Sequence, residues 1–315
     1  MEAETVAAIS NMKNDTIEDL ILQLDLPEEF SNYISLYFEP LSELFHQYSL
    51  ASPTPVIGIN GSQGSGKTTA AVILKSLLET KYRHQVVILS IDDFYHTKAK
   101  RNELAQSLHP LFATRGVPGT HDVDLALHTI QQLKQLHKGE SSSIPRFDKA
   151  IDDRKVEKQW DKIEGPVSII IFEGWCIGSQ AIDKDSLLDP INDLEKFEDK
   201  KGIWRTCSNE FLAGEYQTLF KQIDYLLMLK APNFDVVYQW RLLQEQKLAE
   251  CLKNSPEKAS YYLLNPAQLK RFIQYYQRLT EHNLSAIPAE ANAIITLNDK
   301  HQMTHIDFNH TRCCS

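Results

Sequence analysis

Short runs of apolar residues alternate along this chain with longer stretches in which apolar residues recur at helical spacing. Continuous apolar runs are typical of strands buried on both faces of a sheet, and their alternation with helices is typical of parallel strands joined by crossover helices. The pattern predicts an α/β fold with a doubly wound, mostly parallel sheet, in which ligands bind at the carboxyl ends of the strands. The predicted strands cover residues 56–59, 86–91, 167–172, 223–229 and 292–297, and the predicted helices between them include 123–136, 234–251 and 266–284.

The first 50 residues carry two further amphipathic stripes. The first begins behind Thr16 and Asp19, which have the spacing of a capping box, and the second extends from Tyr33 to Tyr48. We expect residues 1–50 to form a helical extension packed on a core domain of residues 51–315, and the alternative is an arm that docks on a partner protein. Within the core domain we expect a plain loop at 139–143, an insertion around 180–215 with a surface excursion at 183–202, and a lid around 232–262.

A glycine-rich turn follows the first predicted strand. Four of its residues fit the pattern G-x-x-x-x-G-K-[ST], and a helical run follows directly. In this pattern backbone N–H groups close around a pyrophosphate, Lys67 reaches the β- and γ-phosphates, and Thr68 is a ligand for Mg²⁺. A chance match is the alternative, but the strand before the turn and the helix after it argue against chance. We therefore predict a P-loop nucleotide site formed by Gly61, Ser62, Gln63, Gly64, Ser65, Gly66, Lys67, Thr68 and Thr69.

Carboxylates stand at the ends of the next two predicted strands. Asp92 and Asp93 follow the second strand, and Glu173 follows the third. Transfer of a phosphoryl group to an alcohol needs an acceptor for the hydroxyl proton, which Asp92 can supply. Asp93 can act through a Mg²⁺-bound water or cap the next segment, and Glu173 is expected to contact the metal shell or the substrate. For the aspartates the alternative is a turn-forming role.

Cationic residues gather in two segments between the second and third strands, at 115–122 and 145–149. In an acidic chain such a group predicts a pocket for an anionic acceptor, because arginine pairs well with carboxylates. The alternative is ordinary solvated surface charge, and Asp122 can be a simple helix cap. The pocket is predicted to be formed by Arg115, His121, Arg146 and Lys149, with Asp93 and Tyr95 beside it.

Arg241, on the helix after the fourth strand, has two interpretations of equal weight. It can be a lid cation that closes on the departing β–γ bridge, or it can pair with Glu245 four residues along the helix.

Composition excludes several classes of protein. A formal net charge of −9 leaves no basic stripe for a phosphate backbone, so we expect no nucleic-acid partner. No apolar run approaches the roughly 18 residues of a membrane span, and the acidic start does not resemble a secretory leader. The five cysteines lack C-x-x-C spacing and are expected to be reduced thiols of a cytoplasmic protein: Cys176, Cys207, Cys251, Cys313 and Cys314.

Taken together, these motifs resemble the phosphoribulokinase, uridine kinase and pantothenate kinase group, and most closely its D-glycerate 3-kinase branch. The matching stretches are 61–69, 90–95, 115–122, 145–149, 172–175, 204–213 and 238–248. By this resemblance Asp92 is the catalytic base and Arg241 the lid arginine. Phe147 is a departure, because the pattern leads one to expect tyrosine there.

The resemblance implies an ATP- and Mg²⁺-dependent kinase for a small, anionic, hydroxyl-bearing metabolite, with D-glycerate, giving 3-phosphoglycerate, as the leading acceptor. In this interpretation Asp92 deprotonates the acceptor, Lys67 and Arg241 neutralise charge, and Thr68 and Glu173 organise the metal. One alternative is another acceptor, such as a pantothenate-like acid, a nucleoside or a sugar phosphate. The others are a nucleotide-dependent switch or assembly protein and a scaffold that binds ATP without transfer.

Overall fold

The computed structural model describes residues 17–253 and 264–309. Thr16 of the expected capping box, residues 254–262 of the expected lid, and Cys313 and Cys314 lie outside the described residues, as does the side chain of Cys251.

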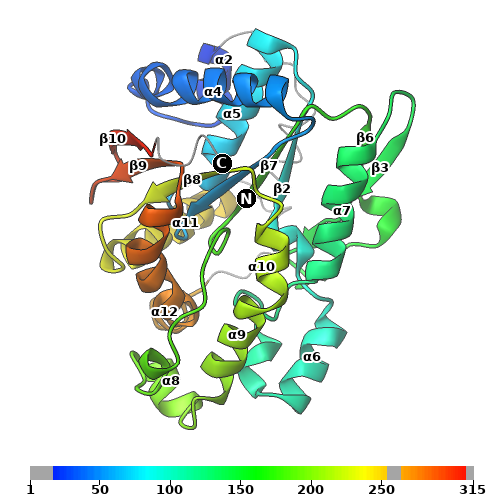
Figure 1. The fold of residues 1–315 in the computed structure, drawn as a ribbon. Coiled ribbons are helices and arrows are strands. Elements are labelled where there is room, and N and C mark those ends of the chain that lie inside the picture. Colours follow the sequence, from blue (N-terminus) through cyan, green and yellow to red (C-terminus); the bar gives the residue numbers. More distant parts are fainter. Residues whose placement is uncertain (1–16, 254–263, 310–315) are drawn as a thin grey trace.

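A six-stranded sheet forms the centre of the molecule, with the strand order β10-β9-β8-β1-β7-β2 (Figure 1). All neighbours pair in parallel except β10 and β9, which are antiparallel. The predicted doubly wound, mostly parallel fold is therefore confirmed. The strands are β1 (Val56–Gly61), β2 (Val86–Ser90), β7 (Ile169–Gly174), β8 (Tyr225–Lys230), β9 (Ala293–Leu297) and β10 (Met303–Phe308).

Helices cover both faces of the sheet. Side chains of β1 alternate between two hydrophobic clusters, with Ile57 and Ile59 in one and Val56 in the other. The first cluster contains α5 (Lys67–Tyr82), α4 (Glu39–Ala51) and the start of α11 (Asp235–Lys253). Side chains of the second face come from α7 (Val123–Gln135), α9 (Ile203–Ala213), α10 (Glu215–Phe220) and α12 (Pro266–Glu290).

The segment before β1 packs on the first face. It contains α2 (Ile17–Gln23), α3 (Phe30–Tyr33), a π-helical segment (Ile34–Phe38) and α4. Leu20, Phe38 and Phe45 are fully buried in the same cluster as α5, and the ring of Phe45 meets that of Tyr225 edge to face. These contacts favour the packed helical extension over a docking arm, because the main apolar side chains are already covered.

One expectation about the connections was wrong. Residues 139–143 were expected to be a loop, but β3 (Ser141–Ile144) pairs with β6 (Asp161–Glu164), and β4 (Phe147–Asp148) pairs with β5 (Asp153–Arg154). The 183–202 segment is mostly exposed, as expected of a surface excursion, but α8 (Asp193–Glu198) contacts α12 and Leu187 and Leu194 are buried. Paired charges hold this segment in place, and pairs of this kind cannot be seen in a local hydrophobic pattern.

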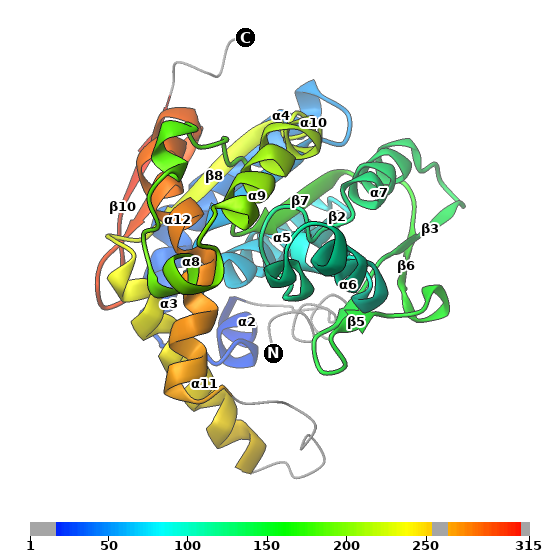
Figure 2. The same ribbon diagram turned by 90° about the horizontal axis from the view of Figure 1, so that it is seen from below.

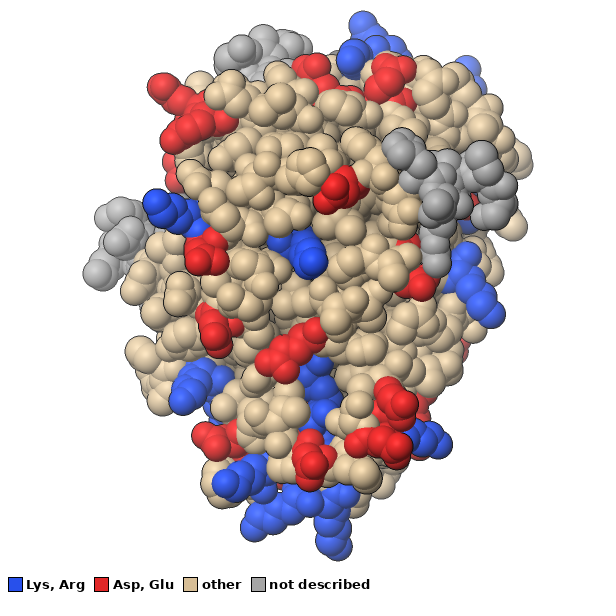
Figure 3. All heavy atoms as spheres, turned by 60° about the vertical axis from the view of Figure 1, so that its left-hand side comes forward, with Lys and Arg blue, Asp and Glu red and all other residues tan. Residues whose placement is uncertain are grey.

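The remaining elements surround the sheet. Figure 2 shows α11 and α12 extending side by side beyond it, and the face in Figure 3 carries both signs of charge interspersed. Within the described residues no helix combines the length and the apolar character needed to cross a membrane. The other helices are α6 (Lys98–Ser107) and the 3-10 segments Ile91–Phe94, Pro110–Ala113, Glu157–Gln159 and Asp185–Leu187.

Candidate active site

The turn between β1 and α5 has the backbone that a phosphate loop requires. Gly64 and Gly66 have φ angles of 79° and 90°, in the left-handed region that favours glycine. At Gly61 a Cβ would lie only 2.5 Å from the Ser65 hydroxyl oxygen, so the turn closes tightly on itself. The glycines of the motif are thus required by conformation and by close approach.

Polar side chains of this loop are buried but leave hydrogen-bonding capacity. Among the described residues Ser62 Oγ, Gln63 Oε1 and Ser65 Oγ have no partner, and Lys67 Nζ donates to the Ser62 carbonyl at 3.0 Å. Buried polar atoms without partners are costly, unless a ligand completes them. The Ser62 and Ser65 hydroxyls can donate to a bound polyphosphate, at which the start of α5 is directed, whereas the Gln63 oxygen can only accept.

Thr68 and Glu173 meet at the same place. Thr68 Oγ1 donates to Glu173 Oε1 at 3.3 Å, and the Glu173 side chain is buried at the end of β7. Both are hard oxygen ligands of the kind that hold Mg²⁺ beside substrate phosphates. No cluster of three metal-ligating His, Cys, Asp or Glu side chains occurs in 17–253 and 264–309.

Helix α11 contacts the phosphate loop directly. A Cβ on Gly64 would lie 2.9 Å from the Cβ of Trp240, so the first turns of this helix pack on the turn. The next residue, Arg241, forms an ion pair with Glu245, as one of its two interpretations predicted. Its charge also acts to lower the pKa of Tyr276, a pKa that burial and Asp92 raise overall.

Asp92 stands at the end of β2, next to the strand that carries Glu173. Its carboxylate accepts from Tyr95 Oη at 2.9 Å and from Lys149 Nζ at 2.8 Å. Burial acts to raise the pKa of Asp92, but Lys149 and the Tyr95 hydrogen bond outweigh it and hold that pKa well below its usual value. Asp92 is therefore ionised, and the order β1-β7-β2 brings it to the same edge of the sheet as the loop and Glu173.

Asp93 and Arg146 bind each other. Arg146 Nη1 donates to Asp93 Oδ2 at 2.6 Å and its Nε donates to Asp161 Oδ2 at 2.8 Å, while Asp93 Oδ1 accepts from the Phe147 amide. These bonds join the end of β2 to the β4–β5 hairpin. Both residues were predicted to touch the acceptor or its metal-bound water; in this structure they are anchors, and a direct contact stays a prediction.

Arg115 lies on the aromatic side of the site. It forms an ion pair with Asp152, and its guanidinium is 5.4 Å from the centre of the Phe147 ring. The ring of Tyr95 also contacts Phe147, edge to face, with the ring centres 5.3 Å apart. Phe147 lacks the hydroxyl that a tyrosine would have at this position, so the Arg115 guanidinium faces a purely apolar ring.

His121 differs from the prediction. The sequence placed it in a group of cations for an anionic acceptor. Burial lowers the pKa of His121 to about 3, so the ring is neutral and adds no positive charge. Asp122 caps α7 by accepting from the Leu125 amide at 3.1 Å, and it also pairs with Arg154. The cation in contact with Asp92 is therefore Lys149.

Three contacts of the site were not predicted from the sequence: those of Trp240 with the loop, of Lys149 with Asp92, and of Tyr276 with the Trp175 ring, 4.9 Å away. Tyr276 and Trp240 belong to amphipathic helices, in which a residue facing a site and a residue facing the core have the same spacing. No local signal separates the two.

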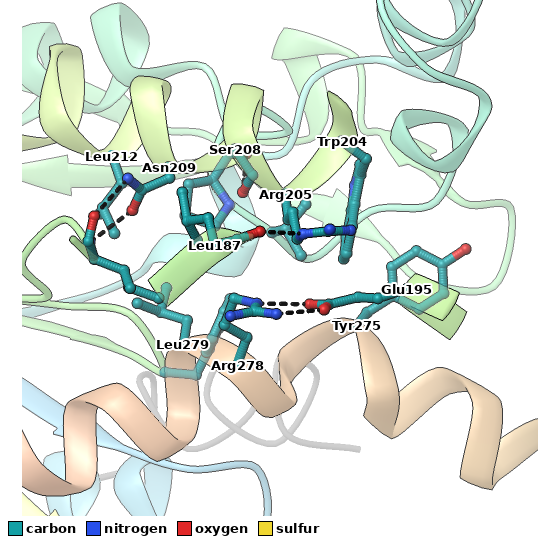
Figure 4. Close-up of a pocket in the computed structure, with 14 residues that line it drawn as sticks. Leu187, Glu195, Trp204, Arg205, Ser208, Asn209, Leu212, Tyr275, Arg278 and Leu279 are labelled. Carbon is teal, nitrogen blue, oxygen red and sulfur yellow. Dashed lines mark hydrogen bonds and ion pairs between the residues drawn. The ribbon is translucent and has the colours of Figure 1, made fainter. Parts of the chain in front are cut away.

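A cavity of about 40 Å³ lies behind the 116–119 segment, between α9 and α12. Figure 4 shows Arg278 and Glu195 facing each other there, with Arg205 nearby. Arg278 donates to both Glu195 oxygens, and Arg205 donates to Asp199 and to the Leu187 and Leu188 carbonyls. Because neither Asp92 nor the phosphate loop lines this cavity, we do not assign it to the acceptor.

Comparison with known proteins identifies the family. The model of the phosphoribulokinase / uridine kinase family matches residues 56–185. The uncharacterized kinase mug58 of Schizosaccharomyces pombe is 38% identical over 205 residues, a match that covers 61% of this chain and 70% of that protein. The chain belongs to the phosphoribulokinase/uridine kinase family.

Its relatives in this family include a D-glycerate 3-kinase. The chloroplastic D-glycerate 3-kinase of Arabidopsis thaliana is 33% identical over 200 residues, which cover 61% of this chain but only 41% of the plant protein. The solved D-glycerate 3-kinase of Cryptococcus neoformans superimposes with a TM-score of 0.68, covering 85% of this chain and 99% of that chain at 23% identity. The YGR205w protein gives a TM-score of 0.63 at 23% identity, covering 88% and 95%. The resemblance expected from the motifs is confirmed for the family, and the structures confirm the fold.

Proposed function

We propose that this chain is an ATP- and Mg²⁺-dependent kinase that phosphorylates a hydroxyl group of D-glycerate, giving 3-phosphoglycerate. The observation that carries the proposal is an ionised Asp92, paired with Lys149, at the same sheet edge as a phosphate loop with unpartnered buried atoms. The D-glycerate 3-kinase named among the relatives supports this acceptor over others.

Each residue has a part in this proposal. ATP supplies the γ-phosphoryl group, and Mg²⁺ neutralises its oxygens. The loop amides and Lys67 hold the phosphates, Thr68 and Glu173 hold the metal shell, and Asp92 orients the acceptor hydroxyl and takes its proton. Arg241 leaves Glu245 to neutralise the departing bridge oxygen, in a lid movement of α11.

An anionic acceptor solves a problem that the structure poses. A carboxylate with a strongly lowered pKa is a weak base, and Lys149 is the main attractive partner that lowers the pKa of Asp92. If the acceptor's own carboxylate accepts hydrogen bonds from Lys149 and Arg115, the pKa of Asp92 rises when the substrate binds, and Asp92 becomes a stronger base. A neutral acceptor such as a nucleoside would leave Lys149 on Asp92.

An acceptor screen tests the proposal. Purified protein with ATP and Mg²⁺ is assayed for ADP release with D-glycerate, L-glycerate, pantothenate, uridine or a sugar phosphate, and without acceptor. We expect release that depends on D-glycerate, with the product identified by mass spectrometry as a monophosphate. Slow acceptor-independent hydrolysis that a protein partner stimulates would instead identify a switch or assembly protein, and turnover of another acceptor would refute glycerate. A cytoplasmic location and the absence of a nucleic-acid or membrane partner stay predictions.

A further inference from the structure

The ring of His121 is enclosed between two tyrosines. Tyr95 stacks on one face with ring centres 4.5 Å apart and planes 21° apart, and Tyr216 of α10 meets the ring edge-on. His121 is 1% exposed and Tyr216 is fully buried. The two tyrosines connect this buried ring to different parts of the molecule, because Tyr95 also donates to Asp92.

The hydrogen bonds of Tyr216 have a fixed direction. Its phenol oxygen accepts from the Gly119 amide at 3.0 Å and faces the backbone amide of His121, and amides can only donate. Burial raises the pKa of Tyr216 well above its usual value, so the phenol keeps its own proton. That proton goes to His121 Nδ1, which lies 2.6 Å from the phenol oxygen.

The tautomer of His121 follows from this arrangement. A neutral imidazole has one donor nitrogen and one acceptor nitrogen. Since Nδ1 accepts from Tyr216, the ring proton lies on Nε2. Within the part of the chain that the structure describes, Nε2 has no hydrogen-bond partner, although it is buried.

A buried donor without a partner indicates that a ligand completes it in another state. The groups that act on the His121 pKa besides burial are Asp92 and His96, so the ring lies close to the base of the proposed reaction. A neutral donor can hold an acceptor oxygen there without adding a positive charge that would weaken Asp92 further.

We propose that Tyr216 is a positioning residue that holds His121 as the Nε2–H tautomer, so that His121 donates a hydrogen bond to an oxygen of the phosphoryl acceptor beside Asp92. The proposal deepens the kinase function and rests on it for the identity of the ligand. It does not rest on it for the tautomer.

The tautomer is tested first, by ¹⁵N NMR of histidine-labelled protein without substrate. We expect the wild-type His121 ring to show a protonated Nε2 and an unprotonated Nδ1 throughout pH 5–8. In Tyr216→Phe, which keeps the ring and loses the hydroxyl, the Nδ1–H form should appear. A protonated Nδ1 in the wild type, or an unchanged spectrum in Tyr216→Phe, would overturn the proposal whatever the activity.

Donation to the acceptor is tested with two amide variants. In His121→Gln the amide nitrogen reaches the place of Nε2, whereas in His121→Asn it reaches only the place of Nδ1. We expect the acceptor KM to rise about tenfold more in His121→Asn than in His121→Gln, as the loss of one hydrogen bond predicts, with the ATP KM unchanged in both. Tyr216→Phe should also raise the acceptor KM, and its Tm is measured to separate this effect from loss of folding.

The outcomes separate the two proposals. Equal acceptor KM values for His121→Gln and His121→Asn would refute donation by Nε2 while leaving the kinase intact. A wild-type protein that turns over none of the screened acceptors would refute the kinase function and the ligand together, and the NMR spectra would still decide the tautomer.

Discussion

The two halves of the proposed active site are built differently. Polar atoms of Ser62, Gln63 and Ser65 in the phosphate loop are buried without partners among the described residues, in a tight turn that its glycines allow. On the acceptor side the charges are joined to one another, with Arg115 on Asp152, Arg146 on Asp93 and Lys149 on Asp92. If the proposed function holds, the nucleotide half is complementary to its ligand in advance, whereas the acceptor half exchanges partners within itself when a ligand binds.

This difference implies different responses to mutation. Removing a group from the loop removes a contact that only the nucleotide completes, so binding and turnover should fall together. Removing one member of an ion pair on the acceptor side leaves the other member buried without a partner. The measured change therefore combines the loss of the first group with the freeing of the second. The predictions below use variants that separate these responses.

The largest effect is expected for Asp92→Asn. The amide keeps the size and the Tyr95 contact but cannot take the proton, so kcat should fall by about 10²–10⁴-fold while the nucleotide Kd changes little. Steady-state kinetics and calorimetry with an ATP analogue measure the two quantities. Asp189→Asn, an exposed residue far along the chain, serves as the control for the loss of one carboxylate. Wild-type turnover by Asp92→Asn would remove it as the base.

The next largest effect is expected for Lys67→Ala. Lys67 is held over the loop by the Ser62 carbonyl, in position to meet the phosphates. Loss of this cation should weaken nucleotide binding and lower kcat together, with a loss in kcat of about 10²–10³-fold. Lys81→Ala, at the exposed far end of the same helix, should leave both unchanged. Weak nucleotide binding with normal kcat would show that Lys67 acts in the ground state alone.

The difference between the phosphate loop and the acceptor half also decides how much of the structure the sequence predicts. The backbone of the loop could be predicted, because it depends on conformations that Gly64 and Gly66 allow within a few residues of the chain, while its binding of a nucleotide stays a prediction. The parallel strands could be predicted for a similar reason, since each is a continuous apolar run. The edge strand β10 was missed, because its residues are mostly exposed and its pattern is interrupted.

The acceptor half could be predicted only as a list of residues. Its residues were listed, with His121 among the cations, but their partners come from elements far apart in the sequence, as in the contact of Asp92 with Lys149, 57 positions later. The neutral state of His121 was missed for the same reason, because it depends on burial by Tyr216. Spacing along the chain contains no information about such contacts.

Arg115→Ala tests the exchange of partners on the acceptor side. We expect the acceptor KM to rise by about tenfold and the ATP KM to stay near its wild-type value, because one of the two cations for the acceptor's carboxylate is lost. Asp152→Asn is the matched variant, since it weakens the hold on Arg115 and should leave the acceptor KM equal or lower. Its Tm is measured as well, because Asp152 also pairs with the buried Arg101. An equal rise of both KM values in Arg115→Ala would discredit the anion site.

The last prediction concerns stability and His121. Because burial lowers the pKa of His121 to about 3, the unfolded chain binds this proton first as the pH falls below about 6.5, the ordinary value for histidine. The contribution of His121 to the free energy of unfolding is fully present above that pH. It decreases by about 1.4 kcal/mol per pH unit as the pH falls to about 3. His121→Gln cannot titrate, so the free energy of unfolding of the wild type relative to this variant should decrease with that slope in urea titrations between pH 6 and 4. His128→Gln, which removes an exposed ring from α7, controls for the loss of a histidine. A difference between wild type and His121→Gln that does not change with pH would mean that the ring accepts a proton inside the fold, and the acceptor half would then hold a third cation that opposes the base.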